Sequence, residues 1–136
     1  MKSLVLKKYG DIENFEVRDV PIPSIRPGHV LIKVAASSVN PVDVKIRQGL
    51  LPIGPDLPAT LHGDMSGEII DIGAGVTEFK KGDEVYGCVG GFKELPGVLA
   101  EFIIADSQLI ALKPKNLSME EAAVLPLVSI TAWNGI

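Results

Sequence analysis

Glycine and proline divide this chain into short runs, and their spacing limits what it can fold into. The 136 residues contain 14 glycines and 10 prolines, which interrupt helices and shape turns. The clearest run between them, residues 29–39, alternates Val30, Ile32 and Val34 with outward-facing positions, as a half-buried strand does. Further strands are predicted at 3–9, 15–23, 66–73, 83–89, 99–106 and 108–114. The spacing therefore predicts a mainly β fold.

A short helix is predicted over residues 41–48. Asn40 suits its N-cap, Pro41 its first position and Gly49 its end. Asn40 therefore has a structural role available to it, independent of any chemistry.

Two helices are predicted near the end of the chain. Within residues 116–125, Ser118 and Glu121 have the spacing of a capping box. Pro126 ends or kinks this helix and begins a second one over 126–136. Because no cap closes the second helix, we expect the chain to be a piece of a longer protein.

Charge and composition argue against several classes of protein. The net charge is −4, and no cluster of Lys and Arg offers a surface for nucleic acid or anionic membrane. No apolar run is long enough to span a bilayer, and the first residues do not form a signal peptide. Cys88 is the only cysteine, so no intramolecular disulfide can form. These features predict a cytoplasmic protein with no membrane span and no nucleic-acid partner.

Residues 73–76 (GAGV) contain the first two glycines of a dinucleotide-binding loop. Glu78 stands where the third glycine is needed, and the next residues predict a strand. A pyrophosphate loop requires a helix N-terminus at that point, because the free N–H groups of a helix bind the phosphates. A tight turn between strands is therefore predicted, and the chain has no nucleotide-binding unit of its own.

The potential metal ligands are few and scattered. His29, His62 and Cys88 are the only histidines and cysteine, and Asp64 follows His62 at a spacing that is not the helical zinc spacing. Zinc takes four protein ligands in structural sites and three plus water in catalytic sites. No metal site is predicted.

Four motifs in order resemble the N-terminal, GroES-like domain of the medium-chain dehydrogenases/reductases. They are SSVNPVDVKIRQG at 37–49, LHGDMSGEIIDIGAGVTEFKKGDEVYG at 61–87, GVLAEFIIADSQLIALKP at 97–114 and LSMEEAAVLPLVSITAW at 117–133. The resemblance implies a GroES-like, partly open β-barrel with a short helix and C-terminal helices. It also implies a catalytic or substrate domain over 1–125, with 126–136 starting the connection to an absent Rossmann cofactor domain.

Within this family, the motif positions resemble the zinc-independent, quinone-oxidoreductase branch. Asn40 stands where zinc-dependent alcohol dehydrogenases carry a catalytic cysteine, and Gly63 stands where they carry the metal-binding histidine. His62 is displaced by one residue, so on an extended backbone it would point to the opposite side. The lobe with four structural cysteines is also missing. The resemblance thus implies an enzyme without zinc.

The resemblance further implies a reductase that transfers hydride from NADPH to a quinone or enone, a small-molecule substrate. NADPH would be bound mainly by the absent domain, and the full-length protein would be a homodimer. Asn40 would be catalytic and lie beside the nicotinamide, with Thr131 contacting the same end of the cofactor. Lys45 replaces a frequent aromatic residue and would be a cationic neighbour of the cofactor or of an anionic substrate. Asp64 would either orient side chains in the cleft or serve as a buried structural carboxylate.

Two readings of the whole chain remain open. The isolated chain could be an inactive fragment of such a reductase, or a non-enzymatic GroES-like module that works by binding or assembly. The ending LPLVSITAW, residues 125–133, favours the reductase because it is typical of the two-domain dehydrogenases.

Overall fold

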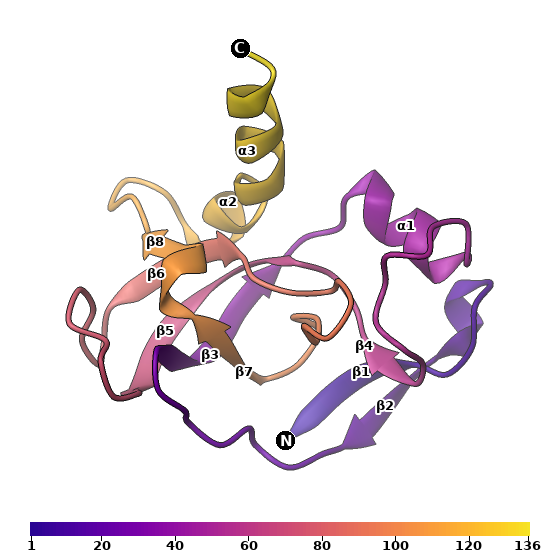
Figure 1. Cartoon of the computed structure of the whole chain (residues 1–136), viewed down its shortest axis with the longest axis horizontal. Helices are drawn as coiled ribbons and strands as arrows, with labels where there is room; N and C mark the ends of the chain where they lie inside the picture. The colour runs from indigo at the N-terminus through magenta and orange to yellow at the C-terminus, as the bar shows by residue number, and fades with distance from the viewer.

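The computed structural model describes all residues from 1 to 136. Two antiparallel sheets form its body (Figure 1), a five-stranded sheet in the order β7-β3-β5-β6-β8 and a three-stranded sheet in the order β2-β1-β4. The strands are β1 (Lys2–Leu6), β2 (Phe15–Asp19), β3 (His29–Ser37), β4 (Ala59–Thr60), β5 (Asp64–Ile72), β6 (Glu84–Cys88), β7 (Phe102–Asp106) and β8 (Ile110–Leu112). The helices are α1 (Pro41–Arg47), α2 (Met119–Ala123) and α3 (Pro126–Asn134), with 3-10 turns at Ile12–Asn14 and Ser107–Leu109. The predicted mainly β fold is confirmed.

The two sheets meet along a narrow seam. The N–H of Leu4 in β1 donates to the carbonyl of Leu99 at 2.8 Å, and Ser3 forms an isolated bridge with Ala100. No continuous ladder joins the sheets, so the barrel is partly open, as predicted.

The larger core cluster is formed mainly by side chains on the inner face of the five-stranded sheet. Val30 and Ile32 on β3, Ile69 on β5 and Val85 on β6 have no exposed surface. Their alternation with exposed positions follows from the two-residue period of a strand, which sends one face inward. A smaller cluster of Leu6, Ile46 and Leu61 holds α1 against β1.

Several strands are shorter than predicted, and one strand was not predicted. The strand predicted at 15–23 ends at Asp19, because Pro21 and Pro23 lack the N–H that a ladder requires. Strand β4, only two residues long, was not predicted. The turn at 73–76 links β5 to β6 as predicted, and Gly75 takes a positive φ of 83° there.

The capping box at the start of α2 is confirmed. The Glu121 N–H donates to Ser118 Oγ at 3.1 Å, and the Ser118 N–H donates to the Glu121 carboxylate at 3.1 Å. The helix spans only Met119–Ala123, shorter than predicted. Ser66 Oγ of β5 donates to the Met119 carbonyl at 2.6 Å, which fastens α2 to the sheet.

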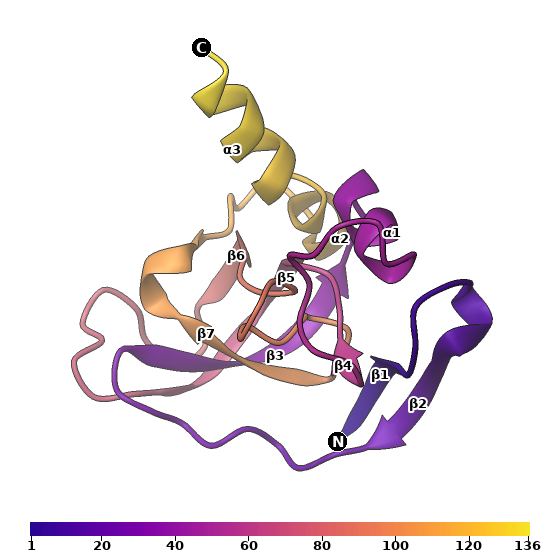
Figure 2. The same cartoon turned by 45° about the vertical axis from the view of Figure 1, so that its right-hand side comes forward.

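Helix α3 stands out from the body in both views (Figures 1 and 2), and the C-terminus lies at its far end. Its apolar side chains are exposed, with Val128 at 51%, Ile130 at 49% and Trp133 at 78%, and only Pro126 is buried. A helix that is apolar on all sides is typical of one covered by other protein. None of the three helices is long and apolar enough to cross a membrane.

Candidate functional site

Asn40 lies where β3 gives way to α1, and it is only 8% exposed. Its main-chain N–H donates to the Asp43 carboxylate at 2.7 Å, the reciprocal half of a capping box. Its side-chain amide nitrogen donates to Asp64 Oδ2 at 3.0 Å. The predicted N-cap position is confirmed, and the side chain also makes a contact outside its own helix.

Asp64 accepts hydrogen bonds from two separate parts of the site, Asn40 and the start of α3. It begins β5 and has no exposed surface. Its two carboxylate oxygens accept from the Leu127 N–H at 3.1 and 3.2 Å. Because Leu125 at the cap of α3 has no acceptor side chain and Pro126 has no N–H, Asp64 serves as the N-terminal acceptor of that helix.

His62 lies on the other side of Gly63 from Asp64. Its φ is 71°, so the expectation of an extended backbone at this residue is wrong. Its ring lies edge-on to Phe15, with ring centroids 6.5 Å apart. Burial lowers the pKa of His62, and the nearby charge of Asp43 partly offsets this effect. Burial raises the pKa of Asp43, with a further contribution from the like charge of Asp64.

Cys88 is paired with Asp64 across the β5–β6 ladder. Burial, followed by the negative charge of Asp64, raises the pKa of the Cys88 thiol to about 12. The thiol is therefore neutral at ordinary pH.

Gly63 leaves no room for a side chain. A β-carbon there would lie 2.7 Å from the Gly90 carbonyl oxygen and 2.9 Å from the Cys88 sulfur. No group of three or more His, Cys, Asp or Glu side chains is arranged to hold a metal ion. The residues present therefore do not fit the zinc site of the dehydrogenases, in which this position carries a ligand.

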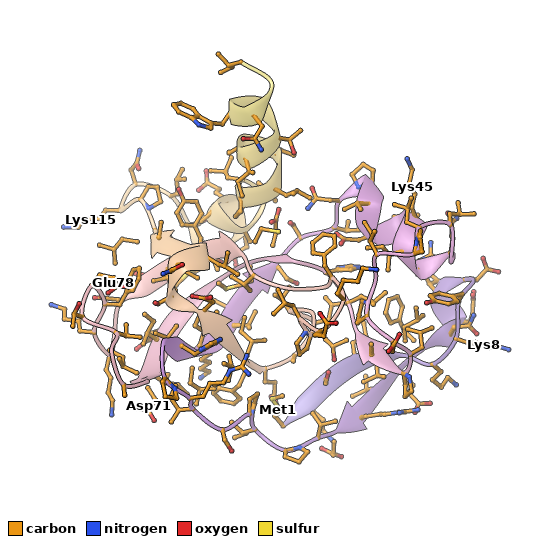
Figure 3. All side chains as sticks on the ribbon, viewed as in Figure 1. Met1, Lys8, Lys45, Asp71, Glu78 and Lys115 are labelled. Atoms are coloured by element: carbon orange, nitrogen blue, oxygen red, sulfur yellow. The ribbon has the colours of Figure 1, made fainter.

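The other two predicted site residues lie apart from Asn40. Lys45 is exposed on α1 and makes no ion pair; Figure 3 shows it in the upper part of the molecule, toward which α3 also projects. Thr131 is exposed on α3. No hydrogen bond joins either residue to Asn40, which is linked instead through Asp64 to the base of α3.

Sequence reasoning left the role of Asp64 open and missed the proximity of His62 to Asp43. The only signal in the sequence was that two ionisable residues, His62 and Asp64, lie on either side of Gly63. The positive φ of His62 could not be read from its residue type, because left-handed backbone at a non-glycine residue is set by its surroundings.

Residues 26–115 match the family of alcohol dehydrogenase GroES-like domains. The chain is 39% identical to a 2-methylene-furan-3-one reductase of Solanum lycopersicum and 38% identical to a chloroplastic NADPH-dependent alkenal/one oxidoreductase of Arabidopsis thaliana, in each case over its whole length. It also resembles the solved structure of a quinone oxidoreductase from Coxiella burnetii, with 35% identity and a TM-score of 0.90 over 98% of this chain. The chain spans 37% of each of the two plant proteins and 43% of the Coxiella protein.

Proposed function

Because this chain belongs to the alcohol dehydrogenase GroES-like domain family, we propose that it forms the substrate-side part of a nicotinamide-dependent oxidoreductase that reduces quinones or activated alkenes. The observation that carries the proposal is the position of Asn40, almost buried at the start of α1 and linked through Asp64 to the base of the exposed helix α3. The names of the plant and Coxiella relatives support the reaction type.

We divide the longer protein at the junction of α2 and α3. Residues 1–125 would be the substrate domain, and 126–136 would start the connection to a Rossmann cofactor domain. The apolar surface of α3, exposed at Val128, Ile130 and Trp133, supports this division because such a helix is normally covered by protein. The short span of the chain relative to its relatives supports it as well.

NADPH, when bound, supplies hydride to the substrate. The chain's own residues would bind and orient the substrate and the cofactor, and they would exclude water from the site. Without a metal, these are the main contributions a protein can make. Asn40 would hold the nicotinamide end of the cofactor by hydrogen bonds from its amide. Thr131 would contact the same end, and Lys45 would place a positive charge near the cofactor.

We propose that the enzyme works without zinc. The crowding at Gly63 supports this, because a metal-binding side chain cannot be placed there without displacing the Gly90 carbonyl. The arrangement of the side chains supports it too, because no group of three or more His, Cys, Asp or Glu could hold a metal ion, whereas a catalytic zinc takes three protein ligands. Metal analysis of the purified protein tests the proposal, and stoichiometric zinc would contradict it.

The compartment and the oligomeric state are proposals as well. A cytoplasmic location is to be tested by cell fractionation, since the Arabidopsis relative is named as chloroplastic. A homodimer of the full-length protein is to be tested by light scattering.

The proposed function is tested in two steps. The natural reading frame is sequenced beyond Ile136, and then the longer protein and the isolated chain 1–136 are both assayed. The longer protein is expected to oxidise NADPH in the presence of a quinone or enone, whereas pure 1–136 is expected to bind NADPH poorly and show no turnover. Turnover by 1–136 alone would contradict the proposed division of labour. A stop codon directly after Ile136 would contradict the reductase itself and favour a binding module.

A further inference from the structure

The carboxylate of Asp64 is completely buried and has no cationic partner. The ion pairs of the chain lie at the surface and involve other residues, so Asp64 depends on hydrogen bonds from neutral donors. The Asn40 side chain donates at 3.0 Å and the Leu127 main chain at 3.1 and 3.2 Å, and the Cys88 thiol on the facing strand is a further donor to the carboxylate. A buried charge is costly unless it is hydrogen-bonded, so the carboxylate needs these donors in order to stay buried.

The carboxylate also dictates how Asn40 is oriented. A carboxylate can only accept hydrogen bonds, whereas an asparagine amide has a donating and an accepting end. The NH₂ end of Asn40 must therefore face Asp64, because the opposite orientation would place two oxygens against each other. One N–H of the Asn40 amide remains for another partner, and the carbonyl oxygen faces the main-chain N–H of Asp43 in the capping box.

We propose that Asp64 is a positioning residue, which fixes the orientation of the Asn40 amide and holds it at a set place relative to the start of α3. The proposal rests on the proposed function only for the role of Asn40 beside the cofactor. A single carboxylate links the asparagine at the start of α1 to the helix that leaves the body, so each of the two loses its hydrogen bond if it moves away from Asp64.

The substitution Asp64→Asn separates this role from simple filling of space. The new side chain has the same shape, but only its oxygen can accept. If that oxygen keeps the Leu127 N–H, the new NH₂ group faces the NH₂ group of Asn40 and forces the Asn40 amide to turn. If the oxygen instead takes the place of Oδ2, it can accept from both Asn40 and Leu127, but the new NH₂ group takes the place of Oδ1, 3.1 Å from the Leu127 nitrogen, and two donors then face each other, which weakens the hydrogen bond of the Leu127 N–H.

Amide hydrogen exchange and the side-chain NH₂ signals in nitrogen-15 NMR spectra of the chain detect both outcomes. In Asp64→Asn we expect either a displaced Asn40 NH₂ signal or exchange of the Leu127 amide that is at least about tenfold faster, since a hydrogen bond to a charged group is lost. Asp71→Asn is the matched control, because Asp71 lies on the same strand and pairs at the surface with Lys81; it should change neither signal.

The double variant Asn40→Ala with Asp64→Asn completes the test. Removing the Asn40 amide removes the conflict between donors, so protection of the Leu127 amide should return to within about threefold of its value in Asn40→Ala alone. Unchanged Asn40 and Leu127 signals in Asp64→Asn, or effects of the two substitutions that simply add, would overturn the proposal.

A kinetic measurement on the full-length protein links the position of Asn40 to the reaction. Asp64→Asn should lower kcat by about tenfold or more while the KM for the quinone changes less than about threefold, because orientation and not binding is disturbed. A rise in KM with unchanged kcat would contradict positioning. If the unaltered full-length protein shows no turnover at all, the proposed function fails, and the exchange measurements still decide the role of Asp64.

Discussion

Gly63 and Cys88 face each other so closely that a β-carbon on Gly63 would lie 2.9 Å from the Cys88 sulfur. The Gly90 carbonyl oxygen closes the same space at 2.7 Å. Gly63 therefore has no room for a side chain unless the neighbouring backbone moves.

The first prediction concerns this crowding. Gly63→Ala should lower the free energy of unfolding by about 1–3 kcal/mol, because the added methyl group must displace backbone. Urea denaturation measures the effect. Gly135→Ala is the control, since the nearest atom to its new β-carbon would be 3.5 Å away, and it should change stability little. Equal stability of Gly63→Ala and the unaltered chain would show that the Gly90 segment yields easily.

The second prediction concerns the reactivity of Cys88. With a thiol pKa of about 12, about one thiol in ten thousand is thiolate at pH 8, and only thiolate reacts with iodoacetamide. We expect alkylation of the folded chain to be at least about a hundredfold slower than alkylation in urea. The rate should rise roughly tenfold per pH unit above pH 8 while the chain stays folded. Rapid labelling at pH 8 would contradict the neutral thiol.

The same thiol affects stability at high pH. A raised pKa in the folded state means that the unfolded chain ionises first, from about pH 9 upward. The stability contributed by the neutral thiol is therefore present below pH 9 and is lost as the pH rises toward 12. Cys88→Ser should reduce this loss, as measured by urea denaturation at pH 8 and pH 10.

The third prediction concerns His62. Because burial lowers its pKa in the folded chain, its contribution to stability is present above the ordinary value of 6.5 and is lost as the pH falls below it. Asp43 acts in the opposite direction, since its raised pKa favours the folded state on protonation. His62→Asn keeps a residue that tolerates the positive φ and should therefore lose less stability between pH 7 and pH 5 than the unaltered chain.

Urea denaturation at the two pH values measures this difference, and His29→Asn is the control, because His29 lies away from Asp43 on the first position of β3. An equal loss of stability in His62→Asn and the unaltered chain would show that folding does not lower the pKa of His62.

The fourth prediction concerns the proposed position of Lys45 beside the cofactor in the full-length protein. Lys45→Met should raise the KM for NADPH about fivefold, because an exposed positive charge near an anionic cofactor contributes roughly 1 kcal/mol. The difference should shrink at high salt, which screens exposed charges. Lys115→Met is the control; Lys115 is also exposed and lies on the other side of α3 in Figure 3. An unchanged KM would remove Lys45 from the cofactor site.

Much of the fold could be predicted because it depends on local chemistry. The alternation of Val30 and Ile32 identifies a strand, and Ser118 with Glu121 identifies a helix start, since the interacting groups are close in sequence. Strand β4 was missed because two residues carry no periodic pattern. The family could be inferred from four motifs in order, and its match over 26–115 confirms that inference.

By itself the sequence determined which chemical groups are present: one asparagine in place of a cysteine, a glycine in place of a histidine, and an aspartate beside it. Only the tertiary structure decided how they are used. Asp64 meets Asn40 across 24 residues of sequence and Leu127 across 63, and no local pattern records such separations. Burial then sets the properties of these groups, because the pKa of Cys88 or His62 depends on which atoms surround it and not on its neighbours along the chain.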